Sequence, residues 1–479
     1  MANGTNKILG IYIGNNDAEC QRLNWTLKIE AMQKLIDCWR TRYLTLQGKI
    51  LIIKSIVLPK IIFSASLLST PDGVIKDINK ILYKFIWGKT ERLQRDVLIN
   101  EYEEGGLCMI DVESHFKALK ATWIERIHKE TNDIWKHLPR SYIKHTTNNL
   151  IMEMSCLSIK QMPILHTIPQ FYQEVILGYC KSNLPTTIDS KSKLFSQILW
   201  GNRLLVVHNT CLFSKSFIDA GYIYVRDILQ ENGKFKDGIY QSLTIKAKYF
   251  RIIDLISCAL KPYKVHRFSD AKVYFPKAVT SKVEKKSKWF YKHIVKEKRK
   301  KAKCIRKWSD YFNHETCWSH VYENKLNSQF EVKIAEFNYK MLNNILPTGD
   351  NLYKWKKVPT PNCIYCGFET HNLQHLFWDC SHLNSLWNII SSILNIEITW
   401  ELLVIGTNKN KNFNTILSLI CFIVYKRYLC NKEKPDCFPN LSNEIVREIE
   451  YRLQVYSNVT CSHETRTRLQ DICNMLTTR

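Results

Sequence analysis

Residues 363–380 read Cys-Ile-Tyr-Cys-Gly-Phe-Glu-Thr-His-Asn-Leu-Gln-His-Leu-Phe-Trp-Asp-Cys. Three cysteines and a histidine stand here at the spacing Cys-x2-Cys-x8-His-x4-Cys, namely Cys363, Cys366, His375 and Cys380. Thiolate and imidazole ligands this close in sequence are typical of a closed, tetrahedral zinc site. The four residues therefore predict one structural Zn²⁺ ion. Because protein atoms would fill all four positions, none is left open for activating water.

A second histidine in this stretch offers an alternative third ligand. Cys366-x4-His371 is the spacing of the retroviral zinc knuckle, but that pattern requires a final cysteine at position 376, which is Leu376. His375 stands at a suitable distance from Cys380, so we favour His375. The competing interpretation is that two of 17 cysteines fall at this spacing by chance and form part of a reduced core. In an α-helix, residues five apart differ by about 140° in direction, so we expect a bend near Asp379 and a new helix after it.

Outside this stretch, helical periodicity dominates the chain. A short strand is expected over residues 7–14. One apolar helix face follows, made by Trp25, Ile29, Met32, Ile36 and Trp39. A second helix begins near Gly48 and is interrupted at Pro59, a third ends at Gly88, and a fourth covers residues 116–127. The pattern weakens over residues 131–280 and returns in the C-terminal part of the chain.

These patterns predict a mainly α protein with a helical, thumb-like bundle, a mixed helical linker region and a helical C-terminal domain that carries a CCHC zinc knuckle. The boundaries that we predict are residues 1–20 for a strand remnant, 21–130 for the bundle, 131–310 for the linker region and 311–479 for the C-terminal domain. The knuckle itself spans residues 363–380.

The chain is strongly basic, with 69 Lys+Arg against 44 Asp+Glu and a formal net charge of +25. Such an excess favours a polyanionic partner: RNA first, with DNA or an RNA–DNA duplex as further candidates. The densest run spans residues 282–307. We predict nucleic-acid contacts from this run and from residues beside the knuckle, namely Lys285, Lys286, Lys288, Lys292, Lys298, Arg299, Lys300, Lys301, Lys303, Arg306, Lys307, Lys356, Lys357 and Tyr365. The alternative is a solvated helix face or a charged linker.

The N-terminal sequence and the cysteine count indicate in which cellular compartment the protein is found. The first residues lack the basic and apolar regions of a secretory signal, and the cysteine number is odd. We therefore expect reduced thiols and an intracellular protein, cytoplasmic or nuclear. The most apolar stretch, residues 416–425, is about half the roughly 20 residues needed to cross a bilayer, so we expect a core helix and no membrane partner.

Several segments resemble the part of a LINE-type (non-LTR) retrotransposon reverse transcriptase that follows its catalytic palm. The segments are Lys7-Ile-Leu-Gly-Ile-Tyr-Ile-Gly14, Trp39-Arg-Thr-Arg-Tyr-Leu-Thr-Leu-Gln-Gly-Lys49, Phe85-Ile-Trp-Gly88, Gly105-Gly-Leu107, Phe337-Asn-Tyr-Lys-Met-Leu342, Leu346-Pro-Thr348 and the knuckle with its Glu369-Thr370 and His375-Leu-Phe377. The resemblance covers roughly residues 4–130 and 310–395. It implies a thumb that grips the template–primer duplex and a C-terminal region that holds element RNA.

The same resemblance implies no polymerase activity for this chain alone. The family's catalytic aspartates would precede residue 1, and the sequence contains no Asp-Asp dipeptide. Three hypotheses remain open: a non-catalytic nucleic-acid-binding remnant, a truncated version of an active RNA-directed DNA polymerase, and a co-opted zinc-containing scaffold that binds protein. The parent reverse transcriptase or a ribonucleoprotein is a candidate partner.

Overall fold

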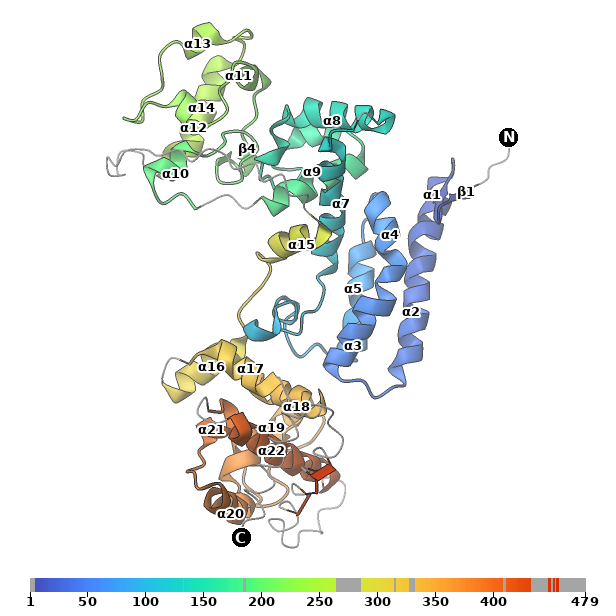
Figure 1. The fold of residues 1–479 in the computed structure, drawn as a ribbon, viewed down its shortest axis with the longest axis vertical. Coiled ribbons are helices and arrows are strands. Elements are labelled where there is room, and N and C mark those ends of the chain that lie inside the picture. Colours follow the sequence, from blue (N-terminus) through green and yellow to red (C-terminus); the bar gives the residue numbers. More distant parts are fainter. Residues whose placement is uncertain are drawn as a thin grey trace. The chain divides into compact units, whose positions relative to one another are not determined.

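The structure is a computed structural model that describes residues 5–131, 133–183, 187–263, 286–313, 316–326, 332–407 and 411–431, with six further residues at 447–448, 451–452 and 454–455. The described chain is mainly helical, as predicted (Figure 1). It divides into two compact units. The first unit comprises Met1–Trp39, Lys54–Leu82 and Ile110–Lys298, and the second comprises Arg40–Ile53, Tyr83–Met109 and Arg299–Arg479. The domain boundaries drawn from the sequence stay predictions.

The N-terminus forms a β-hairpin instead of the single strand that we predicted. Strand β1 (Asn6–Ile8) pairs antiparallel with β2 (Ile11–Ile13). Leu9 and Gly10 form the turn with φ values of 49° and 84°. Two-residue hairpin turns need positive φ at these positions, which glycine supplies without strain. The glycine therefore reverses the chain inside the stretch that we had interpreted as one strand.

The predicted helix boundaries at Pro59 and Gly88 are confirmed. Helix α1 (Asp17–Gln21) and a π turn, η1 (Arg22–Thr26), lead into α2 (Leu27–Arg40). Helix α3 (Leu46–Ile52) and the π turn η2 (Ile53–Val57) precede α4 (Pro59–Leu67), which begins at the proline. Helix α5 (Val74–Trp87) ends at Gly88, which has a φ of 78° and donates its N–H to the Lys84 carbonyl at 2.9 Å.

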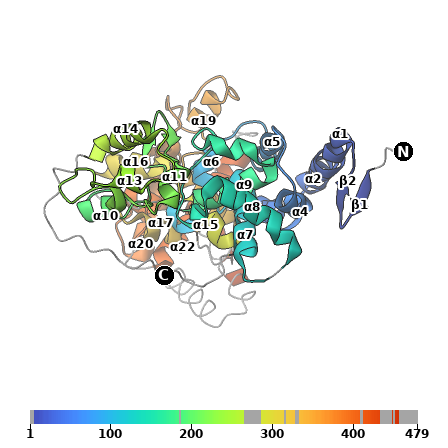
Figure 2. The same cartoon turned by 90° about the horizontal axis from the view of Figure 1, so that it is seen from above.

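Three helices form the main core of the first unit (Figure 2). They are α7 (Val112–His128), α9 (Gln170–Ser182) and α15 (Ser287–Val295). Helices α7 and α9 pack closely at Gly178, where a Cβ atom would lie 2.6 Å from the Lys117 carbonyl oxygen. From α15, Phe290 and Ile294 are fully buried in this core. We call it the α7–α9–α15 core.

After α7, the rest of the first unit consists of further helices, turns and two strands. Those that carry Ile143, Ile151 and Leu165 add buried residues to the α7–α9–α15 core, and others surround a second apolar cluster that includes Trp200 and Phe217. These elements are η4 (Ile134–Lys136), α8 (His137–Thr147), η5 (Leu150–Met152), η6 (Pro163–Thr167), α10 (Lys191–Phe195), β3 (Val206–Val207), β4 (Thr210–Cys211), α11 (Lys215–Asp219), α12 (Val225–Ile228), α13 (Ile239–Ser242), α14 (Tyr249–Leu260) and η7 (Lys261–Tyr263). Strands β3 and β4 form a second antiparallel pair.

The second unit is helical and holds the predicted metal ligands. Besides α3, it contains α6 (Arg95–Leu98), η3 (Tyr102–Glu104), α16 (Lys303–Phe312), α17 (Trp318–Leu326), α18 (Val332–Leu342), α19 (Gly349–Lys354), η9 (His375–Asp379), η10 (Ser381–Leu383), α20 (Asn384–Leu394), α21 (Trp400–Val404) and α22 (Lys411–Asn431). Phe337 of α18 contacts Phe422 and Tyr425 of α22, with ring centroids 5.6 and 5.4 Å apart.

Helix α22 is long and apolar enough to cross a membrane by length and composition alone. The apolar stretch that is long enough is Phe413–Cys430, and 67% of this stretch is buried inside the fold. A core helix of a soluble protein meets the same test, and the packing of Phe422 and Tyr425 against α18 agrees with that interpretation.

Candidate metal centre

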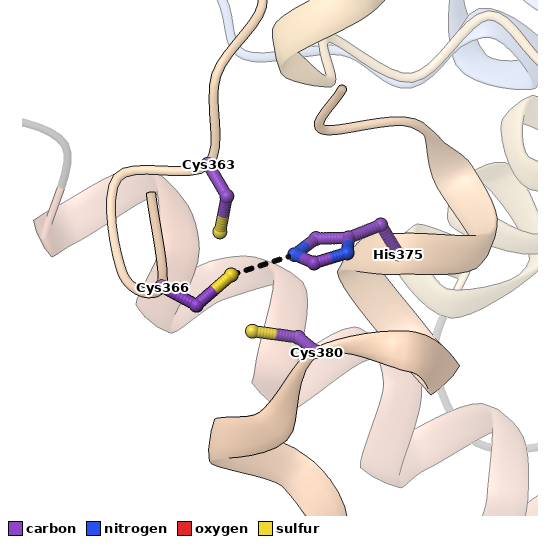
Figure 3. A group of neighbouring side chains, drawn as sticks. All are labelled: Cys363, Cys366, His375 and Cys380. Atoms are coloured by element: carbon purple, nitrogen blue, oxygen red, sulfur yellow. Dashed lines mark hydrogen bonds between the residues drawn. The ribbon is translucent and has the colours of Figure 1, made fainter. Parts of the chain in front are cut away.

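The structure brings together the four residues that the sequence singles out as ligands (Figure 3). One ligand atom from each of Cys363, Cys366, His375 and Cys380 lies within 4.8 Å of the others, and the Cys366 Sγ lies 3.2 Å from the His375 Nε2. Zn–S bonds of about 2.3 Å in a tetrahedron place ligand atoms roughly 3.5–3.8 Å apart. The spacing and the soft donor set therefore fit one zinc ion.

The first half of the site is a tight turn around Gly367. The Cys363 N–H donates to the Phe368 carbonyl at 2.8 Å, and the Gly367 N–H donates to the Cys363 carbonyl at 3.0 Å. Gly367 has a φ of 71°, in the left-handed region that favours glycine. The turn thus directs the sulfurs of Cys363 and Cys366 to the same side.

The second half of the site depends on a π turn. Element η9 is closed by a hydrogen bond from the Cys380 N–H to the His375 carbonyl, at 3.2 Å. A hydrogen bond between residues five apart winds the backbone more loosely than an α-helix does. In an α-helix, His375 and Cys380 would point in different directions. The expected bend lies at Cys380, which is extended with φ −68° and ψ 123°, and the expected new helix is α20.

Two of the thiols, those of Cys363 and Cys380, influence each other's ionisation. The neighbouring Cys380 thiol, with the backbone N–H groups of Cys366 and Tyr365, lowers the pKa of the Cys363 thiol, although burial opposes this. The neighbouring Cys363 thiol and burial raise the pKa of Cys380. The pair therefore loses one proton readily and the second only with difficulty. A bound cation would stabilise the second thiolate, so metal binding should release protons.

His371 lies beside the group but is not placed to act as a ligand. Its Nδ1 accepts a hydrogen bond from the Gly349 N–H at 3.1 Å, so in the neutral ring the proton sits on Nε2. The residue is only 1% exposed, and burial lowers its pKa. The choice of His375 over His371 therefore agrees with the geometry. His371 instead ties the metal loop to the start of α19.

Aromatic side chains support the ligands. The Phe368 ring stacks on the His375 imidazole, with centroids 5.0 Å apart and an interplanar angle of 6°. Phe377 is fully buried against Phe337, and its carbonyl accepts a hydrogen bond from the Trp387 indole at 2.9 Å. The π turn is thus anchored to α18 and α20 through apolar packing, whereas the loop that carries Cys363 and Cys366 is mostly exposed.

One family comparison covers this region. Residues 286–387 match the family described as zinc-binding in reverse transcriptase. The match includes all four clustered residues and most of the basic run. The chain therefore carries a reverse-transcriptase-associated, zinc-binding region. The predicted cofactor, one Zn²⁺ ion, is confirmed by this match together with the four-residue group that could hold it.

The basic run divides into parts with different surroundings. Lys285 lies outside the described residues. Lys286, Lys288 and Lys292 are exposed at α15, whose opposite face is buried in the core. Trp308, directly after the run, is buried and donates its indole N–H to the Leu342 carbonyl at 2.8 Å.

Within the first unit, Lys298 is paired with two carboxylates of the α7 region. Its Nζ lies 2.7 Å from both Asp111 and Glu113. Burial raises the pKa of Glu113, but hydrogen bonds from Lys117 and Lys298 outweigh it and lower that pKa to about 2. These pairs offset the positive charge of Lys298.

Within the second unit, the next two residues of the run are also paired. Arg299 contacts Glu101 and Glu104 at 3.3 and 3.2 Å, and Lys300 contacts Asp96 at 2.7 Å. These partners stand about 200 positions earlier in the chain, so the sequence pattern does not reveal them. The pairs reduce the charge that this part of the run offers to phosphate.

Other predicted contact residues remain at the surface. Lys301, Lys303, Arg306, Lys307, Lys356 and Lys357 are exposed. The Tyr365 hydroxyl is buried, and its ring packs against His382 and Tyr428 with centroids 6.2 and 6.3 Å away. Tyr365 is therefore turned into the fold. The predicted role of these residues in binding nucleic acid stays a prediction.

Proposed function

We propose that this chain is a zinc-structured, nucleic-acid-binding part of a LINE-type retrotransposon reverse transcriptase, and that it binds RNA or a template–primer duplex. One observation carries the proposal: the region that matches the reverse-transcriptase zinc-binding family contains four converging ligands and most of the basic run. The net charge of +25 supports a polyanionic partner.

The zinc ion has a structural role in this proposal. Three thiolates and a neutral imidazole around Zn²⁺ carry a net charge of −1, so the metal centre itself does not attract phosphate. Its contribution is to hold the loop and the π turn in place. Phosphate contacts come from neighbouring lysines and arginines, which would bind largely without sequence preference.

The test is the salt dependence of RNA binding by the full chain. Affinity for a labelled single-stranded RNA should fall steeply between low and moderate salt, because each lysine–phosphate contact releases counterions. Replacing the exposed residues Lys288, Lys292, Lys301 and Lys303 by Ala should flatten the log K versus log salt slope by about 2 to 3 units. A matched variant removes four exposed lysines of the first unit, Lys160, Lys215, Lys234 and Lys236, and should leave the slope unchanged.

A primer-extension assay addresses the enzymatic alternative. We propose that the chain alone does not extend a primer on an RNA template with Mg²⁺. Extension by the purified chain would instead favour an active RNA-directed DNA polymerase. We also propose an intracellular location, cytoplasmic or nuclear, because the zinc ligands must stay reduced.

A further inference from the structure

A second basic surface is centred on the end of α19, about 50 positions after the basic run. Its four exposed side chains are Tyr353, Lys354, Lys356 and Lys357, and with Val358 and Pro359 they line an open hollow. Tyr353 is 51% exposed. An exposed aromatic ring next to several cations is the combination that single-stranded nucleic acid requires, with phosphates on the cations and an unpaired base on the ring.

Two further cations from distant segments extend this surface. The Arg92 guanidinium lies 4.3 Å from the centre of the Trp355 ring. The exposed Lys307 of α16 is close enough to Lys354 for the two charges to interact. Asp350 pairs with Lys354 at 3.1 Å and offsets one charge. Together these groups comprise five cations and one carboxylate, so the surface carries a clear excess of positive charge. We call it the α19 surface.

The backbone holds these lysines in fixed positions. The Lys356 N–H donates to the Tyr353 carbonyl at 2.9 Å, and the Lys357 N–H donates to the Leu352 carbonyl at 2.8 Å. Lys356 has a φ of 57°, a left-handed conformation that is uncommon for any residue with a side chain. Glycine would adopt it more easily, so helix termination alone does not require a lysine at this position.

The zinc loop, residues 361–370, is followed directly by His371, and through this residue it is connected to the first turn of α19 and so to the α19 surface. His371 accepts from the Gly349 N–H through its ring at 3.1 Å and from the Asp350 N–H through its carbonyl, also at 3.1 Å. The His371 N–H in turn donates to the Pro361 carbonyl at 2.8 Å. A Cβ on Gly349 would lie 2.7 Å from that same oxygen. The zinc loop and α19 therefore approach as closely as backbones allow.

From this arrangement we infer that the α19 surface binds single-stranded nucleic acid, with Lys354, Lys356, Lys357 and Arg92 on the phosphates and Tyr353 stacked on a base. This inference rests on the proposed function and specifies where it resides. It also explains how a zinc centre of net negative charge supports RNA binding: the centre positions α19 through His371 and does not touch the ligand.

The experiment measures binding of a fluorescently labelled single-stranded RNA, and of the same sequence as a duplex, to the full zinc-loaded chain. The variant Lys354→Ala, Lys356→Gly, Lys357→Ala removes three charges without opposing the backbone at position 356. It should flatten the salt slope for single-stranded RNA by about 2 units. Tyr353→Ala should weaken binding about tenfold at constant salt, and Tyr353→Phe should restore it. The control Lys215→Ala, Lys234→Ala, Lys236→Ala should bind as the wild type.

Each contrary result has a separate meaning. A wild-type slope in the α19 variant, with RNA bound by the wild type, overturns this inference and leaves the proposed function in place. A greater loss for duplex than for single-stranded RNA overturns the assignment to single strands. Failure of the wild-type chain to bind RNA at all overturns both proposals.

Discussion

The zinc loop and the α7–α9–α15 core are stabilised in different ways. In the core, fully buried side chains such as Ile124, Val175 and Phe290 supply the apolar contacts. In the loop at residues 361–370, most side chains are exposed, and the buried Cys363 is a proposed metal ligand. Apolar burial is therefore sufficient for the core and insufficient for the loop. The comparison indicates that zinc supports one part of the fold and not the other.

Removing zinc should give the largest effect. Structural zinc sites in small domains contribute on the order of 10 kcal/mol of apparent binding free energy. A chelator should therefore expose the backbone amides of residues 361–375 to hydrogen exchange while those of α7 and α9 stay protected. Hydrogen exchange with mass spectrometry measures both regions in one sample. Loss of protection in α7 and α9 at the same rate would break the comparison.

The sequence predicts the metal ligands because their identity and spacing are local. Cys363 and Cys366 share one turn, and His375 with Cys380 share another. Gly88 and Pro59 likewise mark helix boundaries through their own backbone preferences. The π turn at His375 is not predictable in the same way, because it depends on how Phe377 packs against α18.

Contacts between distant segments explain what sequence reasoning missed. The carboxylates that pair with Lys298, Arg299 and Lys300 lie more than 180 positions away in the sequence. The sequence alone therefore overstates how much positive charge the run offers to phosphate. No feature of the sequence indicates that the Arg92 guanidinium contacts the Trp355 ring. The residues Lys354, Lys356 and Lys357 do form a visible charge cluster, and Lys354 could have been included on that ground.

A core truncation should have the next largest effect, in the opposite region. The Phe290 side chain is fully buried, with its ring 5.5 Å from that of Tyr179. Phe290→Ala should lower the free energy of unfolding of the first unit by about 3 to 5 kcal/mol. Urea denaturation gives this value, and the zinc content should remain one ion per chain. Loss of zinc in this variant would contradict the separation of the two regions.

Two buried lysines sharpen the comparison further. Lys325 of α17 is 3% exposed and donates to the Leu403 carbonyl at 2.8 Å, with no salt bridge among the described residues. Burial lowers its pKa to about 8. The folded state then binds this proton more weakly than the unfolded state, so stability should rise between about pH 8 and pH 10.5, by roughly 3 kcal/mol in total.

Lys325→Met should remove this dependence and stabilise the protein near neutral pH. Urea midpoints at pH 7 and pH 10 for the wild type and the variant measure both effects. An unchanged pH dependence in the variant would mean that Lys325 does not lose its charge near pH 8.

Lys120 of α7 is the matched case with a carboxylate partner. Its Nζ lies 3.2 Å from Glu174 and 4.3 Å from the centre of the Phe171 ring. Burial lowers its pKa to about 8, while Glu174 opposes that shift. Lys120→Met leaves the Glu174 carboxylate without this cation, so it should destabilise the fold by about 1 to 2 kcal/mol. A stabilising effect, as expected for Lys325→Met, would show that the pair with Glu174 contributes nothing.

Zinc stoichiometry tests the central claim most directly. Atomic spectroscopy of the purified full chain should give one zinc ion per chain. The double variant Cys363→Ser, Cys380→Ser should give none, while Cys156→Ser, which changes a buried cysteine of the first unit, should keep the full equivalent. A full equivalent retained in the double variant would contradict the assignment of Cys363, Cys366, His375 and Cys380 as the zinc site.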